Sequence, residues 1–311
     1  MGSFDVNSLP REFSRVLPWR SPSTGYCCLV SAHDPSTLKQ TPPELVAVDL
    51  DNTVVDYHYG VATRPTERVI KALRAVREAG VPVAVVTGRA VWGAVRTADD
   101  LELDEGFASA DHGASEYDLG GRRISYRAAV DPAPAVEAFR AADPSVEFGV
   151  AWDLEGWYHT PGFRTDFHGK FAGVVDLDEL AARPTPRLIA RVASDDARDP
   201  GRQDPKALRL ARAAALDPAD YHVEVGFNGW IDIGPPGVNK ASGVARIAAR
   251  YGVSSADTVV FGDAHNDLTM FEWAGYAVAM GQAAPEVRAA ADEVAPSVWE
   301  DGVAQVLERW F

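Results

Sequence analysis

Three short apolar runs of this chain each lead directly into a polar residue. Runs of this length are typical of central strands that a parallel sheet buries on both faces. In an open α/β sheet, ligands bind at the carboxyl ends of the strands, so we expect an α/β fold whose polar clusters meet at one edge. The alternative, that these residues only cap helices or form turns, explains one strand end better than three. The runs and their polar residues are 45–48 with Asp49, 81–86 with Thr87, and 258–261 with Gly262 and Asp263.

Helix signals lie between these runs, as a parallel sheet requires. Thr66 is a suitable N-cap for a helix whose apolar residues recur at helical spacing as far as Gly80. Lys240 opens another such helix, which ends at Gly252. The remaining predicted elements of this sheet region are helices at 91–101 and 267–273, and strands at 107–110 and from residue 277.

A long insertion separates the second polar cluster from Lys240. Residues 115–239 are too many for one crossover helix, and insertions of this length in compact domains are usually structured. The pattern predicts a separate α+β unit that ends in a hairpin, because Asn228-Gly229 is a favoured two-residue type I′ turn. The elements expected in this unit are helices near 133–142 and 205–216, strands at 146–152, 156–160 and 187–193, and the hairpin strands 223–227 and 230–233.

Composition limits the partners and the compartment that we expect. The 311 residues suffice for two domains, and a net charge of −15 argues against binding nucleic acid or an anionic membrane surface. Cys27 and Cys28 are adjacent and are interpreted as strand residues, so we expect no disulfide and a cytoplasmic protein. We find no membrane-spanning run and no signal peptide. Residues 1–42 are interpreted as an N-terminal extension without an assigned role.

Four segments in this order resemble the motifs of the haloacid dehalogenase superfamily, most of whose members are Mg²⁺-dependent phosphatases. The resemblance covers roughly residues 45–311 and is greatest to the Cof-like and sucrose-phosphate-phosphatase-like enzymes, which have a C2-type (type IIB) cap. It implies a Rossmann-like core formed by 43–127 and 237–311, with 128–236 as the cap. Asn52, His112 and Gln282 depart from the usual Gly, Asn and Asn of this branch. The segments are Val-Asp-Leu-Asp-Asn-Thr at 48–53, Val-Val-Thr-Gly-Arg at 85–89, Lys240, and Gly-Asp-Ala-His-Asn-Asp at 262–267.

The residue types in these motifs suit phosphoryl transfer. A carboxylate such as Asp49 can act as nucleophile, and Asp51 can protonate the leaving group and then activate water. Mg²⁺ prefers oxygen ligands, which the acidic residues supply. Asn266 is equally suited to capping the helix that follows it, and His265 is expected to face solvent. The expected phosphate-binding residues are Thr87, Gly88, Lys240 and Asn266, and the expected metal residues are Asp49, Asp51 (through its main-chain carbonyl), Asp263 and Asp267.

We therefore expect an enzyme that hydrolyses a small phosphorylated metabolite, with a sugar phosphate suggested by the resemblance. Phosphotransfer, as in the C2-capped phosphomannomutases, remains open, as does a non-catalytic ligand-binding relative. Substrate choice is expected to come from the cap, although core packing is the simpler explanation for each candidate taken singly. The candidates are Trp152, Trp157, Tyr158, His159, Arg164, His168 and Trp230.

Overall fold

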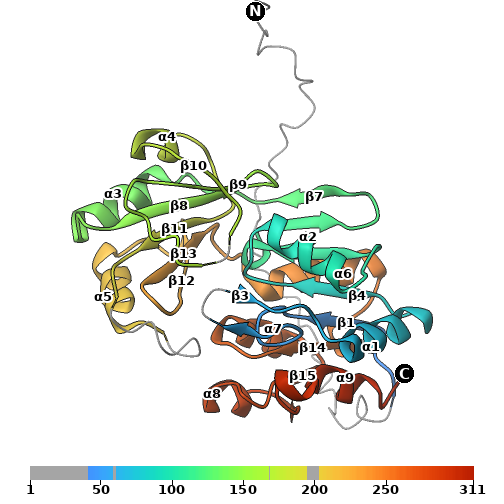
Figure 1. Cartoon of the computed structure of the whole chain (residues 1–311). Coiled ribbons are helices and arrows are strands. Elements are labelled where there is room, and N and C mark those ends of the chain that lie inside the picture. Colours follow the sequence, from blue (N-terminus) through green and yellow to red (C-terminus); the bar gives the residue numbers. More distant parts are fainter. Residues whose placement is uncertain (1–40, 59–60, 168, 195–202) are drawn as a thin grey trace, which may run out of the picture. The chain divides into compact units, whose positions relative to one another are not determined.

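The structure is a computed structural model that describes residues 41–58, 61–167, 169–194 and 203–311. Two sheets and the helices packed against them account for most of this region (Figure 1). The extension, the paired cysteines Cys27 and Cys28, and candidate His168 lie outside the described residues. Within the described ranges, we find no helix with the length and apolar character needed to cross a bilayer.

The larger sheet has eight strands in the order β16-β15-β14-β1-β4-β5-β6-β7. Its strands run parallel from β16 to β5, whereas β6 and β7 are antiparallel additions at one edge. Every residue of β1, β4, β14 and β15 is buried, as expected for strands covered on both faces. The strands are β1 Leu45–Val48, β4 Val83–Val86, β5 Phe107–Ala110, β6 Ser115–Asp118, β7 Arg123–Arg127, β14 Thr258–Gly262, β15 Tyr276–Ala279 and β16 Glu293–Val294.

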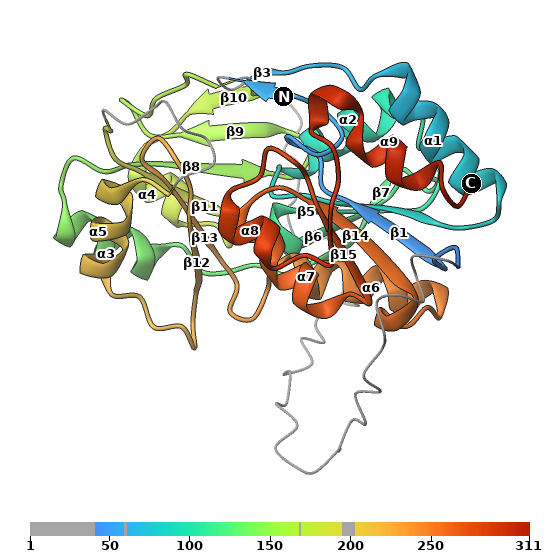
Figure 2. The same cartoon turned by 90° about the horizontal axis from the view of Figure 1, so that it is seen from below.

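Helices cover both faces of this sheet because side chains alternate along each strand. Val46 and Val48 share a hydrophobic cluster with residues of α1 (Glu67–Glu78), α2 (Val91–Asp100) and α9 (Gly302–Leu307). Leu45 and Ala47 point to the other face, where they share a cluster with α6 (Lys240–Tyr251) and α7 (Leu268–Trp273). Figure 2 shows α6 and α7 on one side of β14 and β15, with α1 and α9 on the other.

The helix ends follow local sequence signals. Thr66 caps α1 by accepting a hydrogen bond from the Val69 N–H at 3.2 Å. The α6 helix begins with a capping box between Asn239 and Ser242 and ends at Gly252, whose φ of +70° favours glycine. The predicted helices at these two places are thus confirmed almost to the residue.

The smaller sheet has six strands in the order β10-β9-β8-β11-β13-β12. Helices α3 and α5 pack with one face of it, in a cluster that includes Phe139, Leu210, Phe148 and Ile231. Its other face carries an aromatic cluster, against which Trp92 of α2 also packs. The elements are α3 Ala133–Ala142, β8 Glu147–Trp152, β9 Gly156–His159, β10 Phe171–Val174, α4 Leu177–Ala181, β11 Leu188–Arg191, α5 Pro205–Ala214, β12 His222–Val225 and β13 Trp230–Gly234.

The predicted hairpin turn is present between β12 and β13. Asn228 and Gly229 have φ of +53° and +74°, and the Trp230 N–H donates to the Phe227 carbonyl at 3.1 Å, as a type I′ turn requires. The fold class, a parallel-sheet core with an inserted α+β cap, is therefore as predicted. The domain boundaries at 43–127, 128–236 and 237–311 stay a prediction.

Several predicted elements are shorter than expected, and others were missed. The helix predicted at 205–216 stops at Ala214 because Ala215 adopts a left-handed conformation with φ +48°. The strand predicted at 187–193 is confined to Leu188–Arg191, and the one predicted at 81–86 begins at Val83. The elements that we did not predict include β2 (Tyr57–His58), β3 (Val61–Ala62), β6, β7, β10, α4, α8 (Pro285–Ala289) and β16.

Candidate active site

The carboxyl ends of β1, β4 and β14 meet at one edge of the larger sheet. Val48 pairs with Val85 of β4 and with Phe261 of β14, so the residues that follow these strands emerge side by side. A cleft of about 580 Å³ opens there. Seven of the predicted site residues line it, namely Asp49, Asp51, Thr87, Gly88, Lys240, Asp263 and Asn266. Asp267 is fully buried beside them.

Lys240 holds two carboxylates together at the base of the cleft. Its Nζ lies 2.9 Å from Oδ1 of Asp49 and 2.5 Å from Oδ1 of Asp267. Burial lowers the pKa of the Lys240 ammonium, but the charges of Asp267 and Asp49 outweigh burial and raise the pKa above its ordinary value. Lys240 therefore stays charged where it could meet a phosphoryl group.

Asp267 also organises the loop after β14. Its Oδ2 accepts hydrogen bonds of 2.9 Å from the N–H groups of both Asp263 and Ala264. Both of its carboxylate oxygens are therefore engaged, one by Lys240 and one by the loop. This arrangement fixes the position of Asp263 relative to Lys240.

The carboxylates at this edge carry more negative charge than Lys240 alone neutralises. Burial, reinforced by Asp267 and Asp51, raises the pKa of Asp49 to about 7 in spite of Lys240. Burial and the charges of Asp267 and Asp49 likewise raise the pKa of Asp263 well above its ordinary value. Oxygen atoms of Asp49, Asp263 and Asp267 all lie within 4.8 Å of one another. Such a buried cluster of oxygen ligands suits a divalent cation.

Asp51 faces the cleft and is held by Arg89. The Arg89 guanidinium donates to both carboxylate oxygens of Asp51, with a distance of 2.9 Å from Nε to Oδ2. The same guanidinium donates to the Thr97 hydroxyl at 2.6 Å. Arg89 thus fixes the orientation of the Asp51 carboxylate.

The residues that depart from the expected motifs have clear structural roles. Asn52 adopts a φ of +54°, a conformation that Gly and Asn tolerate better than other residues. Gln282 donates a 2.5 Å hydrogen bond to the Asn52 carbonyl and accepts one from the Val298 N–H. His112 packs so closely on Gly88 that a Cβ there would lie 2.5 Å from its ring. Gln282 and His112 therefore hold the loops that carry the site.

The remaining predicted site residues differ in their surroundings. The Thr87 hydroxyl accepts from the Arg89 N–H at 3.2 Å. Within the described part of the chain, Oδ1 of Asn266 is buried and has no hydrogen-bond partner. His265 lines the cleft, but its Nε2 lies 3.2 Å from Oε1 of Glu286.

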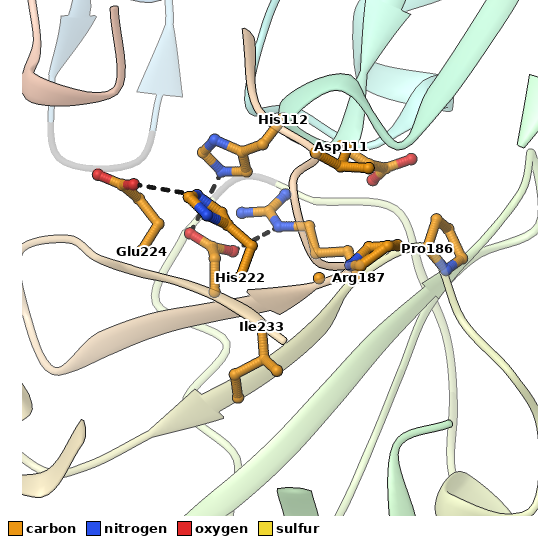
Figure 3. A pocket seen from close by; sticks show the side chains of 11 residues that line it. Asp111, His112, Pro186, Arg187, His222, Glu224 and Ile233 are labelled. Carbon is orange, nitrogen blue, oxygen red and sulfur yellow. Dashed lines mark hydrogen bonds and ion pairs between the residues drawn. The ribbon is translucent and has the colours of Figure 1, made fainter. Parts of the chain in front are cut away.

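Arg187, which no sequence motif marked, joins the smaller sheet to the loop after β4. Its Nη1 donates to the Gly88 carbonyl at 2.6 Å, and its Nε donates to Oδ1 of Asp232 at 2.5 Å. His112, which lies close to Arg187 in Figure 3, approaches the other oxygen of Asp232 at 3.3 Å. Although burial raises the pKa of Asp232, the charges of Arg187 and His112 outweigh it and hold that pKa below its ordinary value.

The sequence signal that could have identified Arg187 is its place in the alternating pattern of β11. Arg187, Ile189 and Arg191 alternate with apolar residues of β11, so two arginines share one strand face. Among the predicted cap candidates, Trp157 and Trp230 line the cleft. Trp152, Tyr158, His159 and Arg164 are not among the residues that line it. Trp152 instead packs against Tyr158, with ring centroids 4.6 Å apart.

Comparisons with known proteins find similar phosphatases and a similar fold. Phosphoglycolate phosphatase of Methanothermobacter thermautotrophicus is 29% identical over 267 residues, covering 86% of this chain and 98% of the relative. The 5-amino-6-(5-phospho-D-ribitylamino)uracil phosphatase YwtE of Bacillus subtilis is 24% identical over 291 residues, covering 85% of this chain and 96% of the relative. A solved structure of a HAD subclass IIB sugar phosphatase has the same fold, with a TM-score of 0.69 at 21% identity, covering 85% of this chain and 97% of that one.

A family model gives the assignment. The model described as haloacid dehalogenase-like hydrolase matches residues 46–307, which include both sheets and every residue of the site. The chain therefore belongs to the haloacid dehalogenase-like hydrolases.

Proposed function

We propose that the chain is a Mg²⁺-dependent phosphatase that hydrolyses a small phosphorylated metabolite, a sugar phosphate, through an aspartyl-phosphate intermediate. The observation that carries this proposal is the position of Asp49. Its carboxylate lies at the end of a central strand, 2.9 Å from a buried ammonium group and within 4.8 Å of oxygen atoms of two further carboxylates. A nucleophile, a fixed positive charge and cation ligands thus converge at one point.

Two displacements complete the reaction. An Asp49 oxygen bonds to phosphorus while the bond from phosphorus to the leaving alkoxide breaks, and Asp51 gives that alkoxide a proton. Water then attacks the aspartyl phosphate, Asp51 takes the proton from the water, and the bond from phosphorus to Asp49 breaks to release inorganic phosphate. Arg89 keeps Asp51 oriented towards the cleft for both steps.

The phosphoryl oxygens need neutralisation, which the surrounding groups can supply. Lys240 provides a point charge, and the Thr87 hydroxyl, the Gly88 N–H and the Asn266 side chain provide hydrogen-bond donors. Asp49, Asp263 and the carbonyl of Asp51 are the best-placed Mg²⁺ ligands, because the Asp267 oxygens already have partners. When bound, Mg²⁺ would offset the negative charge of the carboxylates and of the phosphoryl oxygens.

The comparisons support the class of substrate and leave its organic part open. The two named relatives act on small organic phosphates, and the similar solved structure is that of a sugar phosphatase. The acidic surface predicted from a net charge of −15 is compatible with this, because Lys240 and Mg²⁺ would neutralise the phosphate locally. A cytoplasmic location also stays a prediction.

The test is phosphate release from a panel of sugar and polyol phosphates, with Mg²⁺ or with EDTA. Asp49→Asn keeps the shape of the side chain and removes the nucleophile, and Asp178→Asn is a matched control on the exposed α4 helix. We expect Mg²⁺-dependent release by the wild type and the control, and none by Asp49→Asn. Release that survives in Asp49→Asn, or no release from any panel member, would contradict the proposal. Transfer of the phosphoryl group to a second sugar, without release, would indicate a phosphotransferase.

A further inference from the structure

We propose that the organic part of the substrate carries a planar heteroaromatic ring, which stacks against aromatic side chains in the cleft. This inference rests on the proposed phosphatase function and specifies its substrate class. The phosphoryl group would sit at the carboxylate edge, and the ring would lie between the α2 helix of the core and the β12–β13 turn of the cap.

Several aromatic side chains line the cleft. Five of them are only partly buried, and they come from the regions of both sheets. Hydrophobic and aromatic side chains are the usual lining of sites that bind small molecules. The five come from separate elements: the β2 strand, the α2 helix, the loop after β9 and the β12–β13 turn. These aromatic residues are Tyr57, Trp92, Phe167, Phe227 and Trp230.

Three of these rings have faces that no other ring occupies. Phe167 and Trp230 already pack edge to face, with centroids 5.1 Å apart and planes at 87°. In contrast, Tyr57, Trp92 and Phe227 form no stacked or edge-to-face ring pair with any described residue, although Trp92 packs against the aromatic cluster of the smaller sheet. Aromatic side chains gain from stacking on flat rings, so three unpaired rings around one cleft favour a flat ligand.

Polar groups beside these rings suit the edge of a heterocycle. Trp92 lines the cleft from the first turn of α2. Arg96, one turn further along α2, also lines the cleft and is exposed, and no described group pairs with it. Gln203 also lines the cleft, and its side-chain amide donates to the Val225 carbonyl at 3.1 Å. Carbonyl and ring-nitrogen acceptors on a heterocycle would pair with Arg96.

The size of the cleft agrees with a ligand larger than a single sugar phosphate. Its volume of about 580 Å³ falls within the range of about 300–1,000 Å³ typical of sites that enclose drug-sized ligands. A bare sugar would fill the carboxylate end and leave the aromatic side chains uncovered. A sugar or polyol phosphate that bears a ring would cover both.

The experiment compares substrates that differ only in the ring. Ribose 5-phosphate and uridine 5′-monophosphate share the phosphorylated sugar, and flavin mononucleotide adds a larger ring to a phosphorylated polyol. We expect the wild type to favour at least one ring-bearing substrate over ribose 5-phosphate by about tenfold or more in kcat/KM, the size of one stacking contact. A wild type that hydrolyses ribose 5-phosphate as well as both ring-bearing compounds would overturn the inference while leaving the phosphatase function intact.

Variants then locate the ring. Phe227→Leu and Trp92→Leu keep apolar side chains but remove the stacking faces, so each should reduce the preference for the ring-bearing substrate by about tenfold, mainly through KM. A purely structural defect would lower kcat/KM for both substrates alike and leave the preference unchanged, which would also overturn the inference. Trp299→Leu, at a side chain that is 64% exposed and outside the cleft, should leave both activities unchanged.

Binding without turnover separates this inference from the proposed function. Asp49→Asn is titrated with flavin mononucleotide and with uridine 5′-monophosphate in the presence of Mg²⁺, and heat release is measured by calorimetry. Binding that Phe227→Leu weakens would support the ring site even if the wild type released no phosphate. No binding of either compound, together with no preference in turnover, would contradict it.

Discussion

The guanidinium of Arg187 donates a 2.6 Å hydrogen bond to the carbonyl oxygen of Gly88, the residue after Thr87, which is proposed to bind the phosphate. The same side chain donates to Asp232, which also faces His112. Arg187 and Asp232 belong to the cap, whereas Gly88 and His112 belong to the core. A buried charge pair of the cap is thus tied directly to the edge of the core that would hold the phosphate.

Removing either member of this buried pair should cost more than removing both. The side chains of Arg187 and Asp232 are only 9% and 10% exposed, so a partner left alone would be a buried charge without its main counter-charge, even though His112 still faces Asp232. We expect Arg187→Ala to lower the free energy of unfolding by about 3–5 kcal/mol. Denaturant titration of Arg187→Ala, Asp232→Ala and the double variant measures the coupling. Strictly additive effects would contradict a coupled pair.

Asp267 should matter for turnover although it lies behind the cleft. Asp267→Asn places an amide against the Lys240 ammonium or withdraws the acceptor from the N–H groups of Asp263 and Ala264. We expect kcat/KM to fall by about 10–100-fold, the usual cost of losing a group that orients ligands. Asp178→Asn, in a steady-state assay under the same conditions, is the control that should keep full activity. An Asp267→Asn enzyme with wild-type kcat/KM would show that Lys240 needs no such support.

Local sequence patterns located the site side chains that directly follow buried strands. An apolar run and the polar residue that follows it are both local signals. For this reason the positions of Asp49, Thr87 and Asp263 at one sheet edge could be predicted. The contact of Arg187 with Gly88 joins residues 99 positions apart, and no local pattern encodes it. For the same reason, alternation placed Trp152 and Trp157 in strands but did not say which face would meet the cleft.

The missed strands have a related physical explanation. β6 reads Ser-Glu-Tyr-Asp, and β7 reads Arg-Ile-Ser-Tyr-Arg, so neither shows a continuous apolar run. Both pair antiparallel at the edge of the larger sheet, where one face needs little apolar character. The β6 strand is stabilised by pairing with β5, and β7 in turn by pairing with β6, so neither strand is specified by its own local pattern.

Mg²⁺ should stabilise the protein through the carboxylates of the site. An ion that binds only the folded state adds about 2.7 kcal/mol when its concentration is 100 times Kd. We expect the Tm of the wild type to rise with Mg²⁺ and to return on adding EDTA. Asp263→Asn removes one of the crowded carboxylates, so without metal the variant should be more stable than the wild type near neutral pH. On adding Mg²⁺, the Tm of the variant should rise by less than that of the wild type. Equal Mg²⁺ shifts in calorimetric scans of both proteins would argue against Asp263 as a ligand.

Asp111 should make stability depend on pH. Burial raises the pKa of its carboxyl from 3.8 to about 6, even though Arg187 and Ser115 lower it. The folded state therefore holds the proton more tightly than the unfolded state, and the free energy of unfolding falls as the pH rises from about 4 to 6. The full effect is about 3 kcal/mol for a shift of this size.

Asp111→Asn removes this titration and keeps a residue type that tolerates the observed φ of +51°. The stability of Asp111→Asn relative to the wild type should therefore grow between pH 4 and pH 6 and stay constant above pH 7. Urea titrations at several pH values give this difference directly. A difference that is independent of pH would mean that the carboxyl titrates normally in the folded protein.

The contact between Gly88 and His112 predicts a steric coupling in the loop after β4. A Cβ at position 88 would lie 2.5 Å from the His112 ring, and His112 cannot move freely because it faces Asp232 at 3.3 Å. We expect Gly88→Ala to lower the free energy of unfolding by about 1–3 kcal/mol, the usual cost of overpacking. The matched control is Gly93→Ala on α2, where a Cβ would meet its nearest neighbour at an ordinary 3.5 Å. That change should be neutral or stabilising, because Ala favours a helix more than Gly does.

Adding His112→Ala to Gly88→Ala opens the space that the new methyl group needs. In denaturant titrations, the double variant should therefore be destabilised by less than the sum of the two single changes. The single variant His112→Ala measures the loss of the His112–Asp232 contact. The double-mutant cycle therefore separates this loss from the steric clash between the new methyl group and the His112 ring. If Gly88→Ala proved harmless with His112 intact, the loop after β4 would have to relax away from the ring. In that case the close packing of His112 could not be what requires glycine at position 88.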